Sequence, residues 1–348
     1  MADETWDGIF VRGSLGEDGT LPRNSSSGSP DLIPYGTTPL EDPSILNTQD
    51  TYGDDFSNNI YLERYNYVYM RGKNQHKGSV NGHWELWAVP SNLILLPGLW
   101  RHDEDTVRLK TSDGKESPPF SAENPDEIIS SGNAFTWKVD PLPGNRHYCL
   151  IGIAVSDINP NPIADTDRIS DWGAILAKNG NIAQRNTRLI TGDVPDMSDQ
   201  LPYSQGSETS QVDLTFIFQN IPKGSTFHAA SGTELPGYGT ISLDLGDTQE
   251  FNFKHGIPAL DIPANWATNF NWTLNFGDDW GDISGKPKVT LRGEVPMTSD
   301  HKYYSLGRIA DPHPRTGEQR LDHVGNPIRI MTVGSFQTIA IDKINPNN

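Results

Sequence analysis

Closely spaced carboxylates are the first residues in this sequence that could do chemistry. Asp278, Asp279 and Asp282 surround Trp280 in a stretch that also contains Gly281. Carboxylate oxygens are hard ligands that suit Ca²⁺, and a glycine allows a loop to turn tightly around an ion. The stretch lacks the full residue pattern of a calcium-binding loop, and a run of like charges is usually solvated. We interpret it as a solvated turn, with a Ca²⁺ site at the three aspartates as the alternative. No other cofactor is indicated.

Exposed tryptophans form a second group, because a tryptophan can stack on a sugar ring or anchor a partner protein. The chain contains nine of them, and most are expected in the core. Trp87 is a candidate for exposure because Trp84 and Leu86 already supply apolar side chains to the other face of the same strand. Trp280 is another because acidic residues flank it. These two tryptophans are the predicted ligand-binding residues.

The sequence has no recognisable catalytic motif. It contains no nucleophile elbow, phosphate loop, dinucleotide fingerprint or H-E-x-x-H pair. Its nine histidines lack i,i+4 spacing, so a zinc site would have to be assembled from distant strands. Paired carboxylates on a β-sandwich could hydrolyse a glycosidic bond, but only at a suitable separation. We therefore expect a protein that is not an enzyme, with a β-sandwich glycosidase or lyase as an alternative.

The elements that must position such groups are short strands. Residues 64–71 alternate tyrosines with other side chains, and residues 82–89 form a second strand after a polar turn, which predicts a hairpin. The clearest alternation runs from Phe270 to Phe276, with large apolar residues on one face and polar residues on the other. One face should therefore meet a core and the other should meet water. This pattern predicts an all-β fold of two antiparallel, immunoglobulin-like β-sandwich domains.

The domain organisation follows from where these patterns begin and end. Residues 1–55 are rich in Gly, Ser, Pro and Asp, and they predict an extended N-terminal arm with short edge strands. Residues 56–164 form the first predicted sandwich and residues 211–348 the second. Between them, residues 165–210 are expected to form a short helix, from about Thr166 to Asn179, and a polar linker.

The first hairpin resembles a known family. The segment from Asn66 to Asn74 contains Arg71-Gly72-Lys73-Asn74 and is followed by Trp84-Glu85-Leu86-Trp87. It resembles bacterial immunoglobulin-like modules of the CARDB-like, cell-adhesion-related type, in which such a strand ends in Arg-x-x-Asn before a turn and a second strand. The likeness covers about 100 residues, mainly in the first domain. It implies a β-sandwich and a non-catalytic adhesion, spacer or presenting role in a bacterial surface or secreted protein.

Composition limits the partners. The net charge of −18 opposes binding to nucleic acid and to anionic membranes, since both depend on Lys and Arg. No apolar run is long enough for an integral membrane segment. The single cysteine, Cys149, is expected to be buried. The start of the chain lacks the pattern of a signal peptide, so localisation is open, and a signal-independent export route or release on lysis would fit.

These observations lead to one functional expectation and one further alternative. We expect an acidic, non-enzymatic, bacterial or phage-associated binding or structural protein that recognises a protein or carbohydrate surface. Loops at the sandwich ends would carry its specificity, because loops vary while strands hold them in place. The further alternative is a secreted effector or toxin component that assembles on a host surface. The sequence does not specify the oligomeric state.

Overall fold

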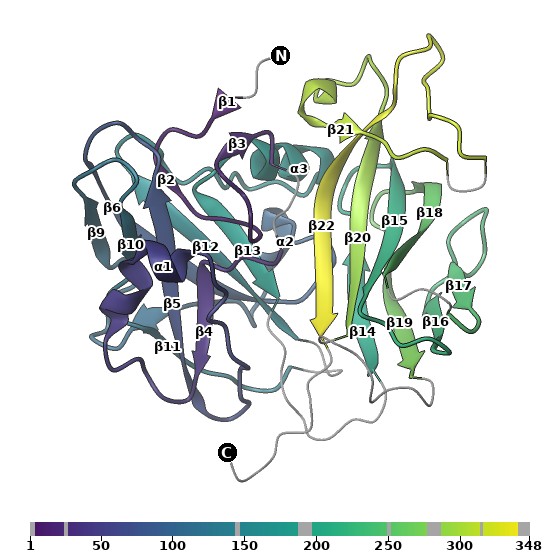
Figure 1. Cartoon of the computed structure of the whole chain (residues 1–348). Coiled ribbons are helices and arrows are strands. Elements are labelled where there is room, and N and C mark those ends of the chain that lie inside the picture. Colours follow the sequence, from purple (N-terminus) through teal and green to yellow (C-terminus); the bar gives the residue numbers. More distant parts are fainter. Residues whose placement is uncertain are drawn as a thin grey trace. The chain divides into compact units, whose positions relative to one another are not determined.

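Antiparallel strands dominate the chain, as the alternating side chains predict (Figure 1). The computed structural model describes residues 4–23, 27–142, 147–186, 197–248, 252–276, 287–313 and 316–339. The chain divides into two compact units. The first contains residues 1–91, 97–166 and 171–190, and the second contains residues 92–96, 167–170 and 191–348. The all-β prediction is confirmed, whereas the immunoglobulin-like topology stays a prediction.

The first unit contains many short strands and a few long ones. Its strands are β1 Glu4–Thr5, β2 Ile9–Phe10, β3 Thr20–Leu21, β4 Leu32–Gly36, β5 Tyr65–Asn74, β6 Val80–Pro90, β7 Val107–Arg108, β8 Lys110–Thr111, β9 Pro119–Ala122, β10 Ile128–Ser130, β11 Phe135–Lys138, β12 Tyr148–Ser156 and β13 Ile182–Asn186. Its helical segments are η1 Pro43–Asn47, α1 Gln49–Tyr52, α2 Pro97–Trp100 and most of α3 Ile169–Lys178.

Two sheets of the first unit enclose its core. The six-stranded sheet follows the order β10-β5-β11-β8, with β2 and β4 also paired to β5. The five-stranded sheet follows the order β13-β12-β6-β7, with β9 also paired to β6. The two strands predicted as a hairpin are β5 and β6, but they lie in different sheets and do not pair with each other, so the hairpin prediction is wrong. Each strand finds its partners elsewhere in the chain, because the polar turn between them carries the chain across to the second sheet.

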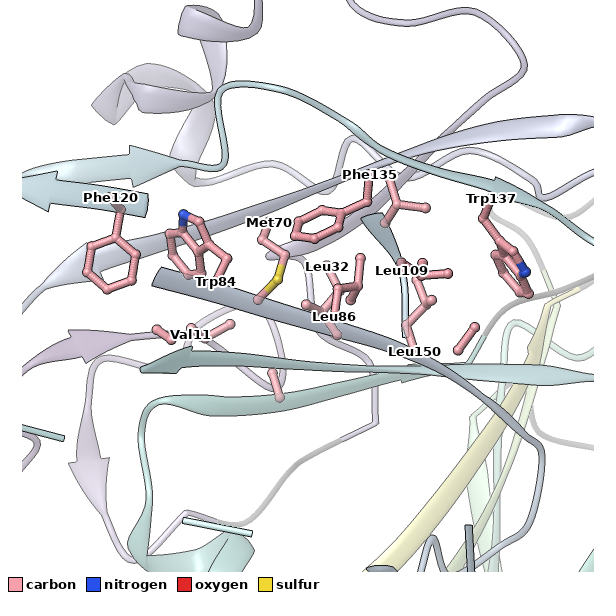
Figure 2. Packing of buried hydrophobic residues seen from close by; sticks show 14 of the residues in the cluster. Val11, Leu32, Met70, Trp84, Leu86, Leu109, Phe120, Phe135, Trp137 and Leu150 are labelled. Carbon is pink, nitrogen blue, oxygen red and sulfur yellow. The ribbon is translucent and has the colours of Figure 1, made fainter. Parts of the chain in front are cut away.

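Figure 2 shows the apolar side chains that lie between these sheets. Met70 from β5 and Trp84 from β6 are completely buried. The ring of Trp84 packs on Phe120, with ring centroids 4.8 Å apart. Trp84 is therefore a core residue, as expected from its strand face. Leu86 is also buried, on the same face as Trp84.

Strand β12 is buried on both faces, as its continuous apolar run suggests. Gly152 lies at its centre, where a Cβ atom would come within 2.3 Å of Leu32 and 2.7 Å of Met70. The strand therefore needs a residue without a side chain at this point, because the six-stranded sheet approaches closely. Cys149 is buried in the same strand.

A buried charge cluster holds the N-terminal arm against the first unit. Arg12 and Arg71 both contact the carboxylate of Asp31, at 2.6 and 3.0 Å, and the side chains of Arg71 and Asp31 are fully buried. Arg12 also lies over the ring of Tyr52, 3.5 Å from its centroid. Arg71 donates further hydrogen bonds to the carbonyl oxygens of Thr51 and other arm residues. Residues predicted as an arm are therefore an integral part of this unit.

The Arg-x-x-Asn pattern of β5 has a structural explanation. Arg71 binds the arm as described, and the side-chain amide of Asn74 donates to the carbonyl oxygens of Gly78 and Asn124. Asn74 also accepts a hydrogen bond from the backbone of His76. Both residues thus fix loops around the end of β5. The resemblance to CARDB-like modules itself stays a prediction.

The predicted helix is present as α3. It begins at Ile169, three residues after the predicted start at Thr166. Ile169, Trp172 and Leu176 are buried and form an apolar stripe on this helix. Gly180 follows this helix without a positive φ. A Cβ atom at Gly180 would lie 2.5 Å from Trp6, so this glycine allows the arm to pack closely.

The second unit is also built from two sheets. Its elements are β14 Met197–Ser204, β15 Ser210–Gln219, β16 Thr226–Ser231, β17 Ser242–Leu245, β18 Phe253–Ile262, β19 Ala267–Asn275, β20 Lys288–Met297, η4 Tyr304–Leu306, β21 Arg308–Ile309 and β22 Arg329–Ile339. The four-stranded sheet has the order β14-β19-β16-β17, and the five-stranded sheet has the order β18-β15-β20-β22-β21 (Figure 1).

Aromatic side chains join the two sheets of the second unit. Phe216 and Phe218 from β15 lie 5.1 and 4.8 Å from Phe227 of β16, measured between ring centroids. Phe227 in turn lies 6.0 Å from Trp272 of β19. Phe270, Trp272 and Leu274 are buried, whereas Asn269, Asn271 and Asn275 are exposed. The prediction that the Phe270 ribbon has one core face and one water face is confirmed.

One part of the predicted linker is a strand. Residues 197–204 form β14, which pairs with β19 along its whole length. Met197, Leu201 and Tyr203 are buried. The polar residues between them concealed this alternation, because they face outward and resemble a linker in composition. Residues 182–186 likewise form β13, which pairs with β12 of the first unit.

Candidate functional site

The acidic stretch proposed as a calcium site cannot be compared with the structure. Asp278, Asp279, Trp280 and Asp282 all lie outside the described residues. Within the part of the chain that is described, no group of three or more His, Cys, Asp or Glu side chains could hold a metal ion. The Ca²⁺ alternative and the binding role of Trp280 therefore stay predictions.

Trp87 lies half-buried on the outer face of β6, opposite Trp84 and Leu86. Its ring packs on Trp100 with centroids 5.7 Å apart, and the guanidinium of Arg108 lies 5.3 Å from its centroid. Contacts of these kinds stabilise a folded protein by burying ring surface and by cation–π attraction. The ring of Trp87, which was predicted to bind a ligand, thus already contacts Trp100 and Arg108 in its own unit.

The polar groups around Trp87 are also paired. Arg108 donates to Glu85 at 2.8 Å and to Ser117 at 2.9 Å. The second carboxylate oxygen of Glu85 accepts a hydrogen bond from the amide of Asn161 at 3.0 Å. A ligand bound here would have to compete with these internal contacts. The binding role of Trp87 stays a prediction.

The outer face of the four-stranded sheet in the second unit has a different character. Asn269, Asn271 and Asn275 project outward from the central strand β19. In the register of the sheet, Asn271 is opposite Gln200 of β14 on one side and Ala230 of β16 on the other. The alternation that buries Phe270 and Trp272 therefore necessarily lines up amide groups on the water side.

Part of this face is hollowed. An open hollow of about 400 Å³ lies over β14 and β19 and reaches the turn after β16. The residues that supply its outward groups are Gln200, Pro202, Ser204, Thr233, Asn269 and Asn271. Its lining contains no Asp, Glu, Lys, Arg or His among the described residues. The hollow is thus polar but uncharged.

Three amide side chains line the hollow and are unpaired within the part of the chain that the structure describes. Those of Gln200, Asn269 and Asn271 make no side-chain hydrogen bond to any residue that the structure describes. The surrounding frame, by contrast, is hydrogen-bonded: Ser204 accepts from Asn92 at 3.1 Å, and the backbone of Thr233 donates to Thr268 at 2.9 Å. Unpaired amides on a fixed frame are an arrangement suited to recognition.

Gly232 keeps one wall of the hollow open. A Cβ atom on this residue would lie 3.4 Å from the carbonyl oxygen of Asn269 and 3.8 Å from the side-chain nitrogen of Asn271. A larger side chain would therefore lie beside the backbone carbonyl of Asn269 and the side-chain amide of Asn271. The backbone of Gly232 donates to the Asn269 carbonyl at 2.9 Å, which fixes the turn in place.

Sequence reasoning placed the polar side of β19 in water but did not identify it as a site. The available signal was composition: Asn269, Asn271, Thr273 and Asn275 carry no charge, whereas solvent-facing positions commonly carry Lys or Glu. Gln200 and Pro202 gave no signal, because their strand was predicted as a linker.

The described residues contain no helix that is long and apolar enough to cross a membrane. The comparisons with known proteins add no family to this description. The sequence matches no protein-family model, and a search of curated proteins finds no match to it.

Proposed function

We propose that this chain is a non-enzymatic binding protein that recognises a neutral glycan on the outer face of the four-stranded sheet of its second unit. The observation that carries the proposal is the uncharged hollow with the free amides of Gln200, Asn269 and Asn271. The general expectation of a protein or carbohydrate partner is thereby narrowed to carbohydrate.

The chemistry of the amides favours a saccharide. Each side-chain amide offers two donors and an acceptor with two lone pairs, and each sugar hydroxyl is both a donor and an acceptor. Fixed amides can therefore satisfy several hydroxyls at once. Pro202, on the same strand face as Gln200, adds a small apolar surface on which the C–H side of a sugar ring can pack.

Charge favours a neutral glycan over an acidic one. The lining of the hollow contains no cation among the described residues, and the whole chain has a net charge of −18. An anionic polysaccharide would lose hydration without gaining an ion pair, and it would be repelled at longer range.

The same lining supports binding rather than hydrolysis. Most glycoside hydrolases place two carboxyl groups on either side of the bond to be cleaved. The hollow has no carboxyl group among its described lining residues. We therefore propose that the bound glycan is released unchanged.

The proposal is tested with the full chain on an array of neutral and acidic glycans, followed by calorimetric titration of a neutral glycan that binds. Asn269→Ala and Asn271→Ala should each weaken the affinity by about 2- to 10-fold, because a net hydrogen bond is worth about 0.5–1.5 kcal/mol. Asn81→Ala is the matched control, since Asn81 is also an exposed strand asparagine but lies on β6 of the first unit.

Three results would contradict the proposal. They are an array on which no neutral glycan binds, an affinity that neither amide substitution changes, and release of a shortened saccharide from the bound glycan. A protein captured by the chain through the hollow would favour the protein partner instead, if Asn271→Ala abolished that capture.

A further inference from the structure

The polar outer face of the four-stranded sheet continues well beyond the hollow. Along β19, Thr273 and Asn275 follow Asn269 and Asn271 on the same side of the strand. His228 of β16 is opposite Thr273, and it is paired through its Nδ1 with Asp244 of β17. Both members of this pair are more than half exposed. The face therefore presents a row of hydrogen-bonding groups across several strands.

The row is longer than a compact ligand requires. Asn269 and Asn275 are six positions apart on one strand, which corresponds to about 20 Å at roughly 3.3 Å per residue. Outward groups recur at every second residue, so their spacing is regular. A regular row of neutral donors and acceptors matches a ligand in which the same hydroxyl groups repeat.

From this arrangement, and resting on the proposed function, we infer that the ligand is an extended saccharide chain that lies along β19. The hollow holds one part of the chain through Asn269 and Asn271. Thr273, Asn275 and His228 contact the sugars that follow. Asp244 orients the ring of His228 for this contact through their hydrogen bond. The class of ligand is thus a neutral oligosaccharide or polysaccharide rather than a single sugar.

The far end of the row keeps binding groups available. The amide nitrogen of Asn275 contacts the Thr226 hydroxyl at 3.4 Å, which is a long hydrogen bond, and the residue as a whole is exposed. The outward residues of β19 itself, at positions 267, 269, 271, 273 and 275, include no aromatic side chain. Direct contacts along the strand should therefore come from hydrogen bonds.

Calorimetric titration with saccharides of increasing length tests the inference. The probes are the cello-, malto- and N-acetylchito-oligosaccharide series, from the disaccharide to the hexasaccharide. Within a series that binds, affinity should rise by at least about tenfold from disaccharide to hexasaccharide and then level off.

Variants locate the added contacts. Asn275→Ala and, as a second variant at the same end, His228→Ala should each weaken hexasaccharide binding about 2- to 10-fold and leave disaccharide binding unchanged. Asn271→Ala should weaken both ligands, and Asn81→Ala should weaken neither. Thermal unfolding checks that each variant is folded.

The outcomes separate this inference from the function on which it rests. Affinity that does not depend on length, or that falls equally for both ligands in Asn275→Ala and His228→Ala, overturns the extended chain and leaves glycan binding at the hollow in place. If no saccharide of any length binds, both the function and the inference are overturned.

Discussion

The buried arginines of the first unit and the free amides of the second unit are both polar groups held in place by β-strands, yet their surroundings differ completely. Arg12 and Arg71 share one carboxylate, Asp31, and are enclosed by protein. Asn269 and Asn271 face water and have no side-chain partner in the described residues. Paired and buried polar groups hold a fold together, whereas unpaired groups on a fixed frame can be used for binding.

The face around Trp87 lies between these two extremes. Trp87 is half-buried and packs on Trp100 and Arg108, and Arg108 is bonded to Glu85. An aromatic residue on an outer strand face therefore does not by itself mark a binding site. What distinguishes the two faces is whether the hydrogen-bonding capacity has been used.

The largest expected effect is on stability at Asp31. Asp31→Ala leaves Arg12 and Arg71 buried without their shared carboxylate, so the free energy of unfolding should fall by about 3–5 kcal/mol. Denaturant unfolding measures the loss. Glu41→Ala is the matched control, because Glu41 is an exposed acidic residue in the same arm and should change stability by less than about 0.5 kcal/mol. A loss at Asp31 as small as that of the control would show that the cluster does not hold the arm.

Trp87→Ala is the next test. Loss of its contacts with Trp100 and Arg108 should lower the free energy of unfolding by about 1–3 kcal/mol, less than for a fully buried tryptophan. Glycan affinity should stay the same. If the glycan affinity fell while the stability was retained, Trp87 would be a binding residue, as the sequence predicts. The amide face would then no longer be the favoured glycan site.

Gly232→Val should have the opposite effect from Trp87→Ala: it should weaken glycan binding and leave stability unchanged. Its side chain would crowd the amide of Asn271 and fill part of the hollow, so glycan affinity should fall by at least about tenfold, or about 1.4 kcal/mol. The fold should be retained, because Gly232 does not have a positive φ and its Cβ would make ordinary contacts. Calorimetry and thermal unfolding measure the two quantities. Full affinity in a folded variant would place the ligand elsewhere.

The sequence predicted those parts of the molecule in which one property repeats along the chain. Large apolar and small polar residues alternate strictly in the Phe270 ribbon, and this repeat predicts a strand with one core face and one water face. β14 was missed because its buried residues are separated by residues that are equally common in loops. The strands that pair with β5 and β6 could not be predicted either, since these partners lie far away in the sequence.

The site was harder to predict than the fold. Amides that face water look alike in sequence whether or not they are free, because pairing is decided by neighbours on other strands. Gln200 meets Asn271 only through the pairing of β14 with β19. The hollow further depends on Gly232. The sequence does not show that this glycine lies next to Asn269 and Asn271.

The smallest expected effect is on the pH dependence of stability, and it again separates the two regions. Asp55 pairs with Arg185 at 2.9 Å in the first unit. Burial acts to raise the pKa of Asp55, but the charge and hydrogen bonds of Arg185, together with the hydrogen bond from the backbone of Ser57, outweigh it and lower the pKa. The unfolded chain therefore binds a proton more readily than the folded chain does. The resulting stabilisation is present above the unfolded pKa of about 3.9 and is lost as the pH falls through the lower folded pKa.

Unfolding of the wild type and of Asp55→Asn across the acid range measures this contribution. The difference between the two proteins should be under about 1 kcal/mol at neutral pH, as for other partly exposed pairs, and should vanish in acid. Disaccharide binding at the hollow should not follow this transition, because none of its described lining residues is an acid or a base. A disaccharide affinity that fell in step with the protonation of Asp55, in a protein still folded, would mean that the amide face is coupled to the charged groups of the first unit and does not act alone.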